Sequence, residues 1–291
     1  WRSIGTDRRQ AETPVDYPGA GLAIFSFLCL AWGLTNAEHA EGNTPLIWIA
    51  VGAIALVLFL WVEATRQHPM MPLSLFRSPV FSVANIYSFT LYSGLSIVFF
   101  YMPMALVGGW GLREIDASIA FAPIPVFMAV LSSRTGKLAD RIGPAPLLVL
   151  GGLVSAVGYA WMALVAPSQA YFDGIIPAMC VVALGMALLV APLSTAVMGS
   201  VDETQSGLAS GINNAVSRLA GLMSVAATGG LVAASYATAG GTASFGEISD
   251  SPGHAAAVST GLATAAWIAA GLCAVSAVAA LGLLRRPQPR A

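Results

Sequence analysis

The chain has 291 residues, of which 57% are hydrophobic and only 9% are charged, and its formal net charge is -1. Soluble globular domains have about a quarter of their residues charged, so this composition excludes that class and indicates an integral membrane protein. The near-neutral charge favours no acidic partner, and we expect no nucleic acid to bind.

The chain begins with a polar and charged segment, residues 1–18, which cannot enter hydrocarbon and is expected to be a cytoplasmic tail or linker. A membrane-spanning helix needs about 20 predominantly apolar residues. Scanning for that length predicts eight spans, at residues 19–36, 45–62, 81–107, 116–133, 146–166, 174–198, 207–236 and 256–284. Pro123 and Pro125 predict a kink in the fourth span. Residues 285–291 are again polar and are expected to form a second tail.

Charge in the tails and loops predicts the orientation of the spans. Eleven of the thirteen basic residues fall on one side: Arg2, Arg8, Arg9, Arg66, Arg77, Arg134, Lys137, Arg141, Arg285, Arg286 and Arg290. The alternate loops carry mainly acidic residues. Because cytoplasmic loops are enriched in Lys and Arg, we expect a multi-pass protein of the cell's inner (plasma) membrane with both termini of this chain in the cytoplasm.

The most basic loop is the one between the fourth and fifth spans, residues 133–146. Gly136 and Gly143 permit backbone angles that other residues resist, so they predict a tight turn between two closely packed helices. Pro144 suits the first turn of the following helix, where its missing N–H costs nothing. On these features alone, the segment is either a plain positive-inside loop with a glycine turn or a functional loop.

The stretch GKLADRIG, residues 136–143, resembles the G-x-L-A-D-R-x-G loop signature of the major facilitator superfamily. In that family the loop joins the second and third helices of a six-helix half, and its charged residues are thought to latch neighbouring helices in one access state. The resemblance implies a conformational latch loop of Gly136, Asp140, Arg141 and Gly143, with Asp140 as the latch acid and Arg141 as its partner. The family usually continues with basic residues where this chain has Pro-Ala-Pro, which implies a weakened latch.

Further patterns resemble one branch of that family, the fourteen-span drug:proton antiporters. They are DYPG at residues 16–19, PLSLFR at 72–77, APLSTAVMGSV at 191–201 and GLASGINN at 207–214. That branch inserts two helices between its six-helix halves. The resemblance therefore implies an all-α integral membrane fold with eight transmembrane helices: two inserted helices and a cytoplasmic loop over residues 19–79, then the C-terminal six-helix half over residues 80–284.

The same resemblance implies that an amino-terminal six-helix half is missing from this chain. The first residue is Trp1 rather than Met, and no signal peptide precedes the first span, so we expect an amino-terminal piece to precede the chain. No internal repeat in the sequence is strong enough to support an argument.

No enzyme constellation is evident. The histidines His39, His68 and His254 are single residues in loops, where they are expected to be solvated, and no Ser/His/Asp or Gly-rich phosphate arrangement can be assembled. The three cysteines lie in apolar runs at spacings that no metal or redox motif uses, so they are expected to be packing residues without a disulfide. We therefore expect no catalysis, no cofactor and no metal.

The third span carries aromatic and polar residues at steps of three and four, which places them along one helical face: Asn85, Phe89, Tyr92, Ser96 and Phe99. Such a face suits an amphipathic substrate, and the resemblance implies that this helix lines the central cavity. Met186 in the sixth span is a further cavity candidate, because flexible thioethers tolerate varied ligands. Ordinary helix packing is the alternative interpretation for each of these residues.

Two acids stand at span ends. Asp116 begins the fourth span at the outer surface, either as a proton-coupling residue that exchanges with the external medium or as a helix N-cap acid. Glu63 ends the second span and is interpreted as interfacial. No acid is expected in the middle of the membrane, although a proton-coupled pump needs one. In the resembling family the principal proton carriers belong to the amino-terminal half.

One basic residue, Arg218, falls within a span. Counted from Gly207, it lies roughly 16 Å into the seventh span, a depth at which a charge is costly in lipid. Gly211, Asn214 and Arg218 follow steps of three and four, so we expect a buried polar stripe in which Asn214 supplies an oxygen near the guanidinium. An arginine that snorkels to the headgroups is the alternative.

Together these patterns predict a transmembrane transporter fragment that exports small amphipathic compounds or drugs by alternating access. Proton coupling is implied by the resemblance alone. The expected partners are the lipid bilayer, a small amphipathic substrate, protons and the missing N-terminal half. Uptake or exchange of a metabolite, and a membrane fragment that transports nothing, are the alternatives.

Overall fold

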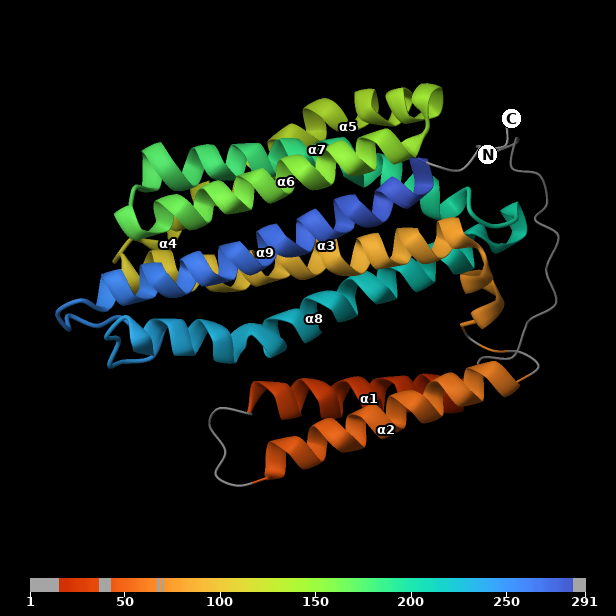
Figure 1. Cartoon of the computed structure of the whole chain (residues 1–291), viewed down its shortest axis with the longest axis horizontal. Coiled ribbons are helices and arrows are strands. Elements are labelled where there is room, and N and C mark those ends of the chain that lie inside the picture. Colours follow the sequence, from red (N-terminus) through yellow and green to blue (C-terminus); the bar gives the residue numbers. More distant parts are fainter. Residues whose placement is uncertain (1–15, 37–42, 67–68, 70, 285–291) are drawn as a thin grey trace, which may run out of the picture. The chain divides into compact units, whose positions relative to one another are not determined.

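A computed structural model of the chain describes residues 16–36, 43–66, 69 and 71–284, and every regular element within these residues is helical (Figure 1). Eight helical segments in this part of the chain are long and apolar enough to cross a membrane. The eight spans expected from the sequence are confirmed, and the chain is a multi-pass membrane protein. Most of both tails, together with His39 and His68, lies outside the described residues.

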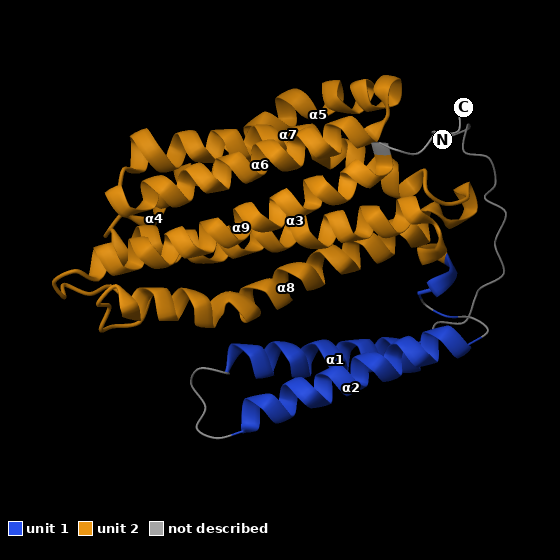
Figure 2. Cartoon of the chain, in the orientation of Figure 1, with its two compact units in different colours: residues 1–74 blue, residues 75–291 orange. Residues whose placement is uncertain are grey.

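The chain divides into two compact units, residues 1–74 and 75–291 (Figure 2). The first unit contains the helices α1 (Tyr17–Thr35) and α2 (Thr44–Thr65). The short helix η1 (Leu73–Arg77) straddles the division, and the second unit contains all the later helices.

Helices α1 and α2 form a hairpin in which the two backbones lie unusually close. A Cβ added to Gly33 would lie 2.9 Å from the backbone nitrogen of Ile49, and one added to Gly52 would lie 2.8 Å from that of Leu30. One turn beyond Leu30 on α1, the Ser26 hydroxyl donates a 2.8 Å hydrogen bond to the carbonyl of Gly52. Since lipid offers helices no hydrophobic drive to associate, close packing and hydrogen bonds of this kind hold the pair together.

The second unit contains six spans, formed by α3 (Pro79–Met104), α4 (Glu114–Ser118) with α5 (Pro123–Ile142), α6 (Pro144–Val165), α7 (Ile176–Met198), α8 (Ser206–Thr238) and α9 (His254–Leu284). Short turns extend or join them: η2 (Ala105–Gly109), η3 (Ile119–Phe121), η4 (Ala166–Ser168), η5 (Tyr171–Ile175) and η6 (Glu203–Gln205). Pro79, Pro123 and Pro144 each begin a helix, the position at which proline loses no hydrogen bond.

The fourth span is broken at its prolines. α4 ends at Ser118, one turn of 3-10 helix follows, and α5 begins at Pro123. Proline lacks the N–H that would continue an α-helix and its ring clashes with the preceding turn. The α-helical hydrogen bonding is therefore interrupted just before Pro123, and a bend of the helix axis at Pro123 and Pro125 stays a prediction.

The six spans of the second unit pack in a symmetric order. Each packs most extensively on its neighbour in the order α5, α7, α6, α9, α3, α8. The first three spans along the chain correspond to the last three: α3 to α7, α5 to α8 and α6 to α9. When each helix in the packing order is replaced by its counterpart, the result is the same order read backwards. Because each set has an odd number of spans, the second set crosses the membrane in the opposite direction, as in the inverted repeats of many transporters. The sequence did not reveal this repeat, because the two sets of three spans have corresponding packing partners but do not have similar side chains.

The two end helices of this order are the least covered. Only 11% of the residues in the window through α4 and α5 are buried, and 28% in that through α8, against 56% for the spans of α3 and α7. The four helices that lie between two neighbours, α3, α6, α7 and α9, supply most of the core, and the spans of α6 and α9 are each 44% buried. The open faces of the unit therefore belong to α5 and α8.

Candidate functional site

The basic segment at residues 133–146 is mostly helix. α5 continues to Ile142 and α6 begins at Pro144, so Gly143 is the whole turn between them. Its φ of 83° and ψ of 160° fall in a region that glycine alone adopts readily. The expectation that Gly136 contributes to this turn is wrong, because the Leu, Lys and Arg residues around it are good helix formers and α5 continues past it.

Asp140 and Arg141 are both exposed on the last turn of α5. Adjacent residues on a helix point in different directions, so these two side chains cannot face each other. Within the described part of the chain they form no ion pair, and the expected partnership between them is wrong. A latch role for Asp140 stays a prediction that requires a partner on another segment.

We expect Gly143→Ala to lower the free energy of unfolding by about 1–3 kcal/mol, because alanine is strained at this backbone conformation. The matched control is Gly136→Ala, whose Cβ would meet only the Cβ of Ala191, at 3.9 Å. That change should be neutral or should stabilise α5 by up to about 1 kcal/mol. Thermal unfolding of the two purified variants measures the difference, and equal losses in both would contradict a turn made by Gly143 alone.

Polar side chains join α3 to α8, in what we call the α3–α8 seam. Asn213 of α8 donates from Nδ2 to the Ser88 hydroxyl at 2.7 Å and to Asn85 Oδ1 at 3.3 Å. Further along, the Ser93 hydroxyl donates to the carbonyl of Ala220 at 3.3 Å. Hydrogen bonds between membrane helices contribute about 0.6–2 kcal/mol each. The seam therefore fixes α8 firmly against α3 by one of its faces.

Ser88, Ser93 and Ser224 belong to this seam and were not predicted. Ser224 donates to the carbonyl of Ser93 at 3.3 Å, so the two serines connect the helices in both directions. The signal in the sequence was a recurrence of small hydroxyl residues inside apolar spans. That signal does not say which helix the hydroxyls meet, because serine also bonds within its own helix.

The six cavity candidates differ in exposure. Asn85 and Met186 are buried, Tyr92 and Ser96 are half-buried, and Phe89 and Phe99 are exposed. The expectation that the buried pair lines a cavity is wrong for this unit, since Asn85 is engaged by Asn213 and Met186 lies within the core. The Phe99 ring packs edge-on to Phe121, with ring centroids 4.9 Å apart. The remaining candidates for a cavity wall are the exposed and half-buried side chains of α3.

The stripe of Gly211, Asn214 and Arg218 is exposed, which corrects the expectation that it is buried. α8 turns its other face to α3, so the stripe points away from the unit. A Cβ added to Gly211 would meet nothing within 4 Å. Among the described residues the Arg218 guanidinium forms no ion pair, and its expected hydrogen bond with Asn214 is not made.

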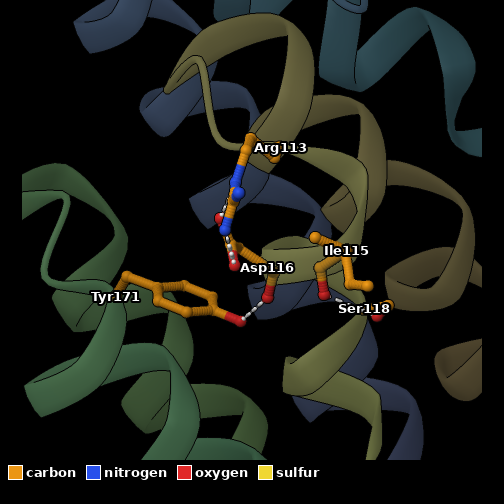
Figure 3. Close-up of polar contacts among 5 residues, drawn as sticks. All are labelled: Arg113, Ile115, Asp116, Ser118 and Tyr171. Atoms are coloured by element: carbon orange, nitrogen blue, oxygen red, sulfur yellow. Dashed lines mark hydrogen bonds and ion pairs between the residues drawn. The ribbon is translucent and has the colours of Figure 1, made fainter.

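Asp116 lies in the first turn of α4, near the helix start where it was expected, although Arg113 occupies the cap position. Figure 3 shows its carboxylate facing the Arg113 guanidinium, whose Nε and Nη2 donate at 2.7 and 3.0 Å. The Tyr171 hydroxyl donates to the backbone carbonyl of Asp116 and so connects α4 to η5. The hydrogen bond to Asp116 raises the pKa of the Arg113 guanidinium. A proton-coupling role for Asp116 stays a prediction.

His254 is buried, so the expectation of a solvated loop histidine is wrong there. Its Nδ1 lies 2.8 Å from the Tyr236 hydroxyl and its Nε2 lies 2.9 Å from the carbonyl of Glu247. The loop between α8 and α9 folds back over the start of α9, which covers the ring. These contacts hold the end of α8 and the start of α9 together, which gives His254 a structural role.

A profile of the Major Facilitator Superfamily matches residues 17–225. The chain is 30% identical over 228 residues to the lincomycin resistance protein of Streptomyces lincolnensis, covering 77% of this chain and 47% of that protein. It is 27% identical over 216 residues to the cephamycin export protein CmcT of Amycolatopsis lactamdurans, covering 73% and 44%. It is 26% identical over 230 residues to the probable multidrug resistance protein EmrY of Escherichia coli (strain K12), covering 77% and 44%.

The chain thus spans about half the length of the curated relatives it matches. The profile covers most of its residues, and the packing of the second unit has the inverted three-helix symmetry found in transporter halves. The chain therefore belongs to the major facilitator superfamily.

Proposed function

We propose that this chain is the carboxy-terminal part of a transporter that exports small amphipathic compounds, drugs among them, by alternating access. In this mechanism the second unit rocks against an amino-terminal six-helix half around a site near the middle of the membrane. The observation that carries the proposal is the exposed polar stripe of α8. It is a face built for protein contact that this unit leaves uncovered.

The stripe is unsuited to lipid. An arginine at the centre of a membrane helix costs about 2.5–3.5 kcal/mol on insertion scales. Gly207 and Gly211 have no neighbour within 4 Å of a Cβ position, so a helix from another segment has room to approach closely. A covering half that lies against α8 gives Arg218 a polar environment and fills the space above the glycines.

The exposed aromatic residues of α3 support an amphipathic substrate. Phe89 is 44% exposed and Phe99 is 39% exposed, and Tyr92 and Ser96 lie between them along the helix. Aromatic surface with a few hydrogen-bonding groups suits ligands that are partly apolar and partly polar. Several relatives are named for antibiotic resistance or export, which favours export over uptake. Proton coupling is part of the proposal because of the antiporter branch that the sequence resembles.

Export is tested in everted membrane vesicles from cells that make this chain together with the proposed amino-terminal half. Acidifying the vesicle interior should drive accumulation of an amphipathic fluorescent dye, and an ionophore that dissipates the pH gradient should stop it. Vesicles that contain this chain alone should accumulate none, since one half supplies only one wall of the cavity. Accumulation by the chain alone, or only in right-side-out vesicles, would contradict the proposal.

We also propose that both termini lie in the cytoplasm and that the protein belongs to the inner membrane. The helical extension of α5 supports this orientation, because Arg134, Lys137 and Arg141 are all exposed on it. Clusters of this kind stay on the cytoplasmic side.

The orientation predicts that a cysteine at Lys137, in a protein whose native cysteines are replaced, resists impermeant thiol reagents in intact cells. A cysteine at Ile248, in the exposed loop between α8 and α9, is the matched control and should react readily. Gel shift of the labelled protein measures both. If the cysteine at Lys137 reacted and the one at Ile248 did not, the topology would be the opposite of the proposed one.

A further inference from the structure

The end of α5 carries three cations on one side of the helix. Arg134, Lys137 and Arg141 follow steps of three and four, so their side chains project from the same face. All three are exposed, and none of them forms an ion pair with the described residues. We call these three residues the basic patch. Its positive charge is therefore available to a partner outside the unit.

The other side of the same turns attaches α5 to the unit. Thr135 is 5% exposed and Ala139 is 2% exposed. The Thr135 hydroxyl donates a 3.0 Å hydrogen bond to the backbone carbonyl of Ala187 on α7. α5 stands at the end of the packing order, with α7 as its main neighbour, and lies at the edge of the second unit (Figure 1). The basic patch consequently points away from the unit.

Toward the middle of the membrane the same face of α5 is apolar. Val126 and Val130 are each 57% exposed, and they precede Arg134 by eight and four residues along the helix. Aliphatic side chains that are this exposed on a membrane span suit contact with acyl chains. The face is thus apolar first and cationic at its end, which is the order in which a lipid monolayer presents its tails and its headgroups.

The length of the fourth span places the basic patch at the level of the headgroups. The span has 29 residues, from Glu114 to Ile142, and at about 1.5 Å per residue it is roughly 44 Å long. The hydrocarbon core of a bilayer is about 30 Å thick, and the bilayer is about 40–45 Å thick with its headgroup regions. Since both ends of the span carry charged residues, each end extends beyond the hydrocarbon into a headgroup region.

We propose that the basic patch binds the headgroups of anionic phospholipids, with the lipid acyl chains lying along Val126 and Val130. A guanidinium can donate two parallel hydrogen bonds to one phosphate, and the ammonium of Lys137 adds a further positive charge. Asp140 is the one acid in residues 133–146, so three cations against one acid leave a net charge of +2 in this segment. The apolar part of the face selects a phospholipid over free phosphate.

This interaction goes beyond the export proposed above, because lipid binding is measured on the purified chain without transport. It is also distinct from the effect of basic residues on membrane orientation. Basic residues that only keep a loop in the cytoplasm act during insertion, and they give the purified protein no preference for one lipid over another. A lipid site gives that preference and loses it when the cations are removed.

Native mass spectrometry measures lipid binding to the chain in detergent, titrated with phosphatidylglycerol or with phosphatidylcholine of the same acyl chains. We expect phosphatidylglycerol to bind about tenfold more tightly or better. Arg134→Gln, Lys137→Gln and Arg141→Gln should each weaken phosphatidylglycerol binding about fivefold, and the triple variant about a hundredfold. Glutamine is a good helix former and all three positions are exposed, so α5 should keep its fold.

Two further variants separate the patch from the total charge of the protein. Asp140→Asn removes the acid beside the patch and should strengthen phosphatidylglycerol binding about fivefold, an effect that a damaged helix cannot imitate. Arg113→Gln is the matched control, because it removes an exposed cation from the opposite end of the same span, where Asp116 already neutralises it. Binding should be unchanged in this variant.

The proposal is overturned if the parent protein binds the two lipids equally, or if the triple glutamine variant keeps its preference for phosphatidylglycerol. It is also overturned if Arg113→Gln weakens binding as much as Arg134→Gln does. A preference that disappears when the chain is purified together with the proposed amino-terminal half would show that protein, and not lipid, covers the patch, and this result too would overturn it.

Discussion

Gly185→Leu is expected to prevent stable assembly of the six-helix unit, at a cost of more than about 3 kcal/mol. Gly185 lies on α7 where that helix crosses α6. A Cβ added there would lie 2.6 Å from the backbone nitrogen of Ser155 and 2.8 Å from the backbone carbonyl of Gly151. These are main-chain atoms that no side-chain rotation can move away, so α6 and α7 would have to separate.

The matched control is Gly271→Leu on α9. A Cβ at Gly271 would meet nothing within 4 Å, and the residue is exposed, so leucine should be accepted without loss. Both variants are measured by the yield of monodisperse protein and by thermal unfolding in the same detergent. Similar yield and unfolding temperature for the two variants would show that the α6–α7 contact does not hold the unit together.

The contact between α6 and α7 depends on glycines at several positions along the two helices. Gly151 and Gly158 are two helical turns apart on α6, and a Cβ at Gly158 would lie 2.7 Å from the backbone nitrogen of Val182. Small residues on one face let two membrane helices approach until dispersion contacts become numerous. Gly185 lies at the same α6–α7 contact, on α7, and its replacement therefore affects the whole crossing.

The number of spans was predictable from the sequence because it depends on a local property, the length of an apolar run. The end of α5 was not. Hydropathy falls where Arg134 and Lys137 begin, near the expected end of the span, yet the helix continues to Ile142. Residues of good helix propensity carry an established helix out of the membrane until a special conformation stops it, here at Gly143.

The environment of single residues was less predictable than the faces they share. Asn85 and Phe89 lie one turn apart on α3, yet Asn85 is 4% exposed and Phe89 is 44% exposed. Spacing assigns both to one face, but it does not show that Asn213 of α8 covers only the first of them. Likewise Glu63 looked interfacial from its place at the end of an apolar run, yet it is 2% exposed and accepts a hydrogen bond from the backbone nitrogen of Met71.

The exposure of Arg218 sharpens the test of the proposed transporter. Its guanidinium lies on the open face of α8 and forms no ion pair with the described residues, so leucine at this position breaks no ion pair there. Leucine is also better tolerated by lipid than arginine, so membrane insertion should not suffer. Any loss of transport in Arg218→Leu must therefore arise from what covers the stripe.

We expect Arg218→Leu to lower dye export by the two-half transporter about tenfold or more, equivalent to at least about 1.4 kcal/mol on the transport barrier. The amount of protein in the membrane should be unchanged. Arg218→Lys keeps a cation on the stripe and should retain part of the activity. Arg113→Leu removes an exposed cation at the outer end of α4 and should export nearly as well as the parent. If Arg218→Leu exports as well as Arg113→Leu, the arginine serves only to reach the lipid headgroups, and α8 does not face the other half.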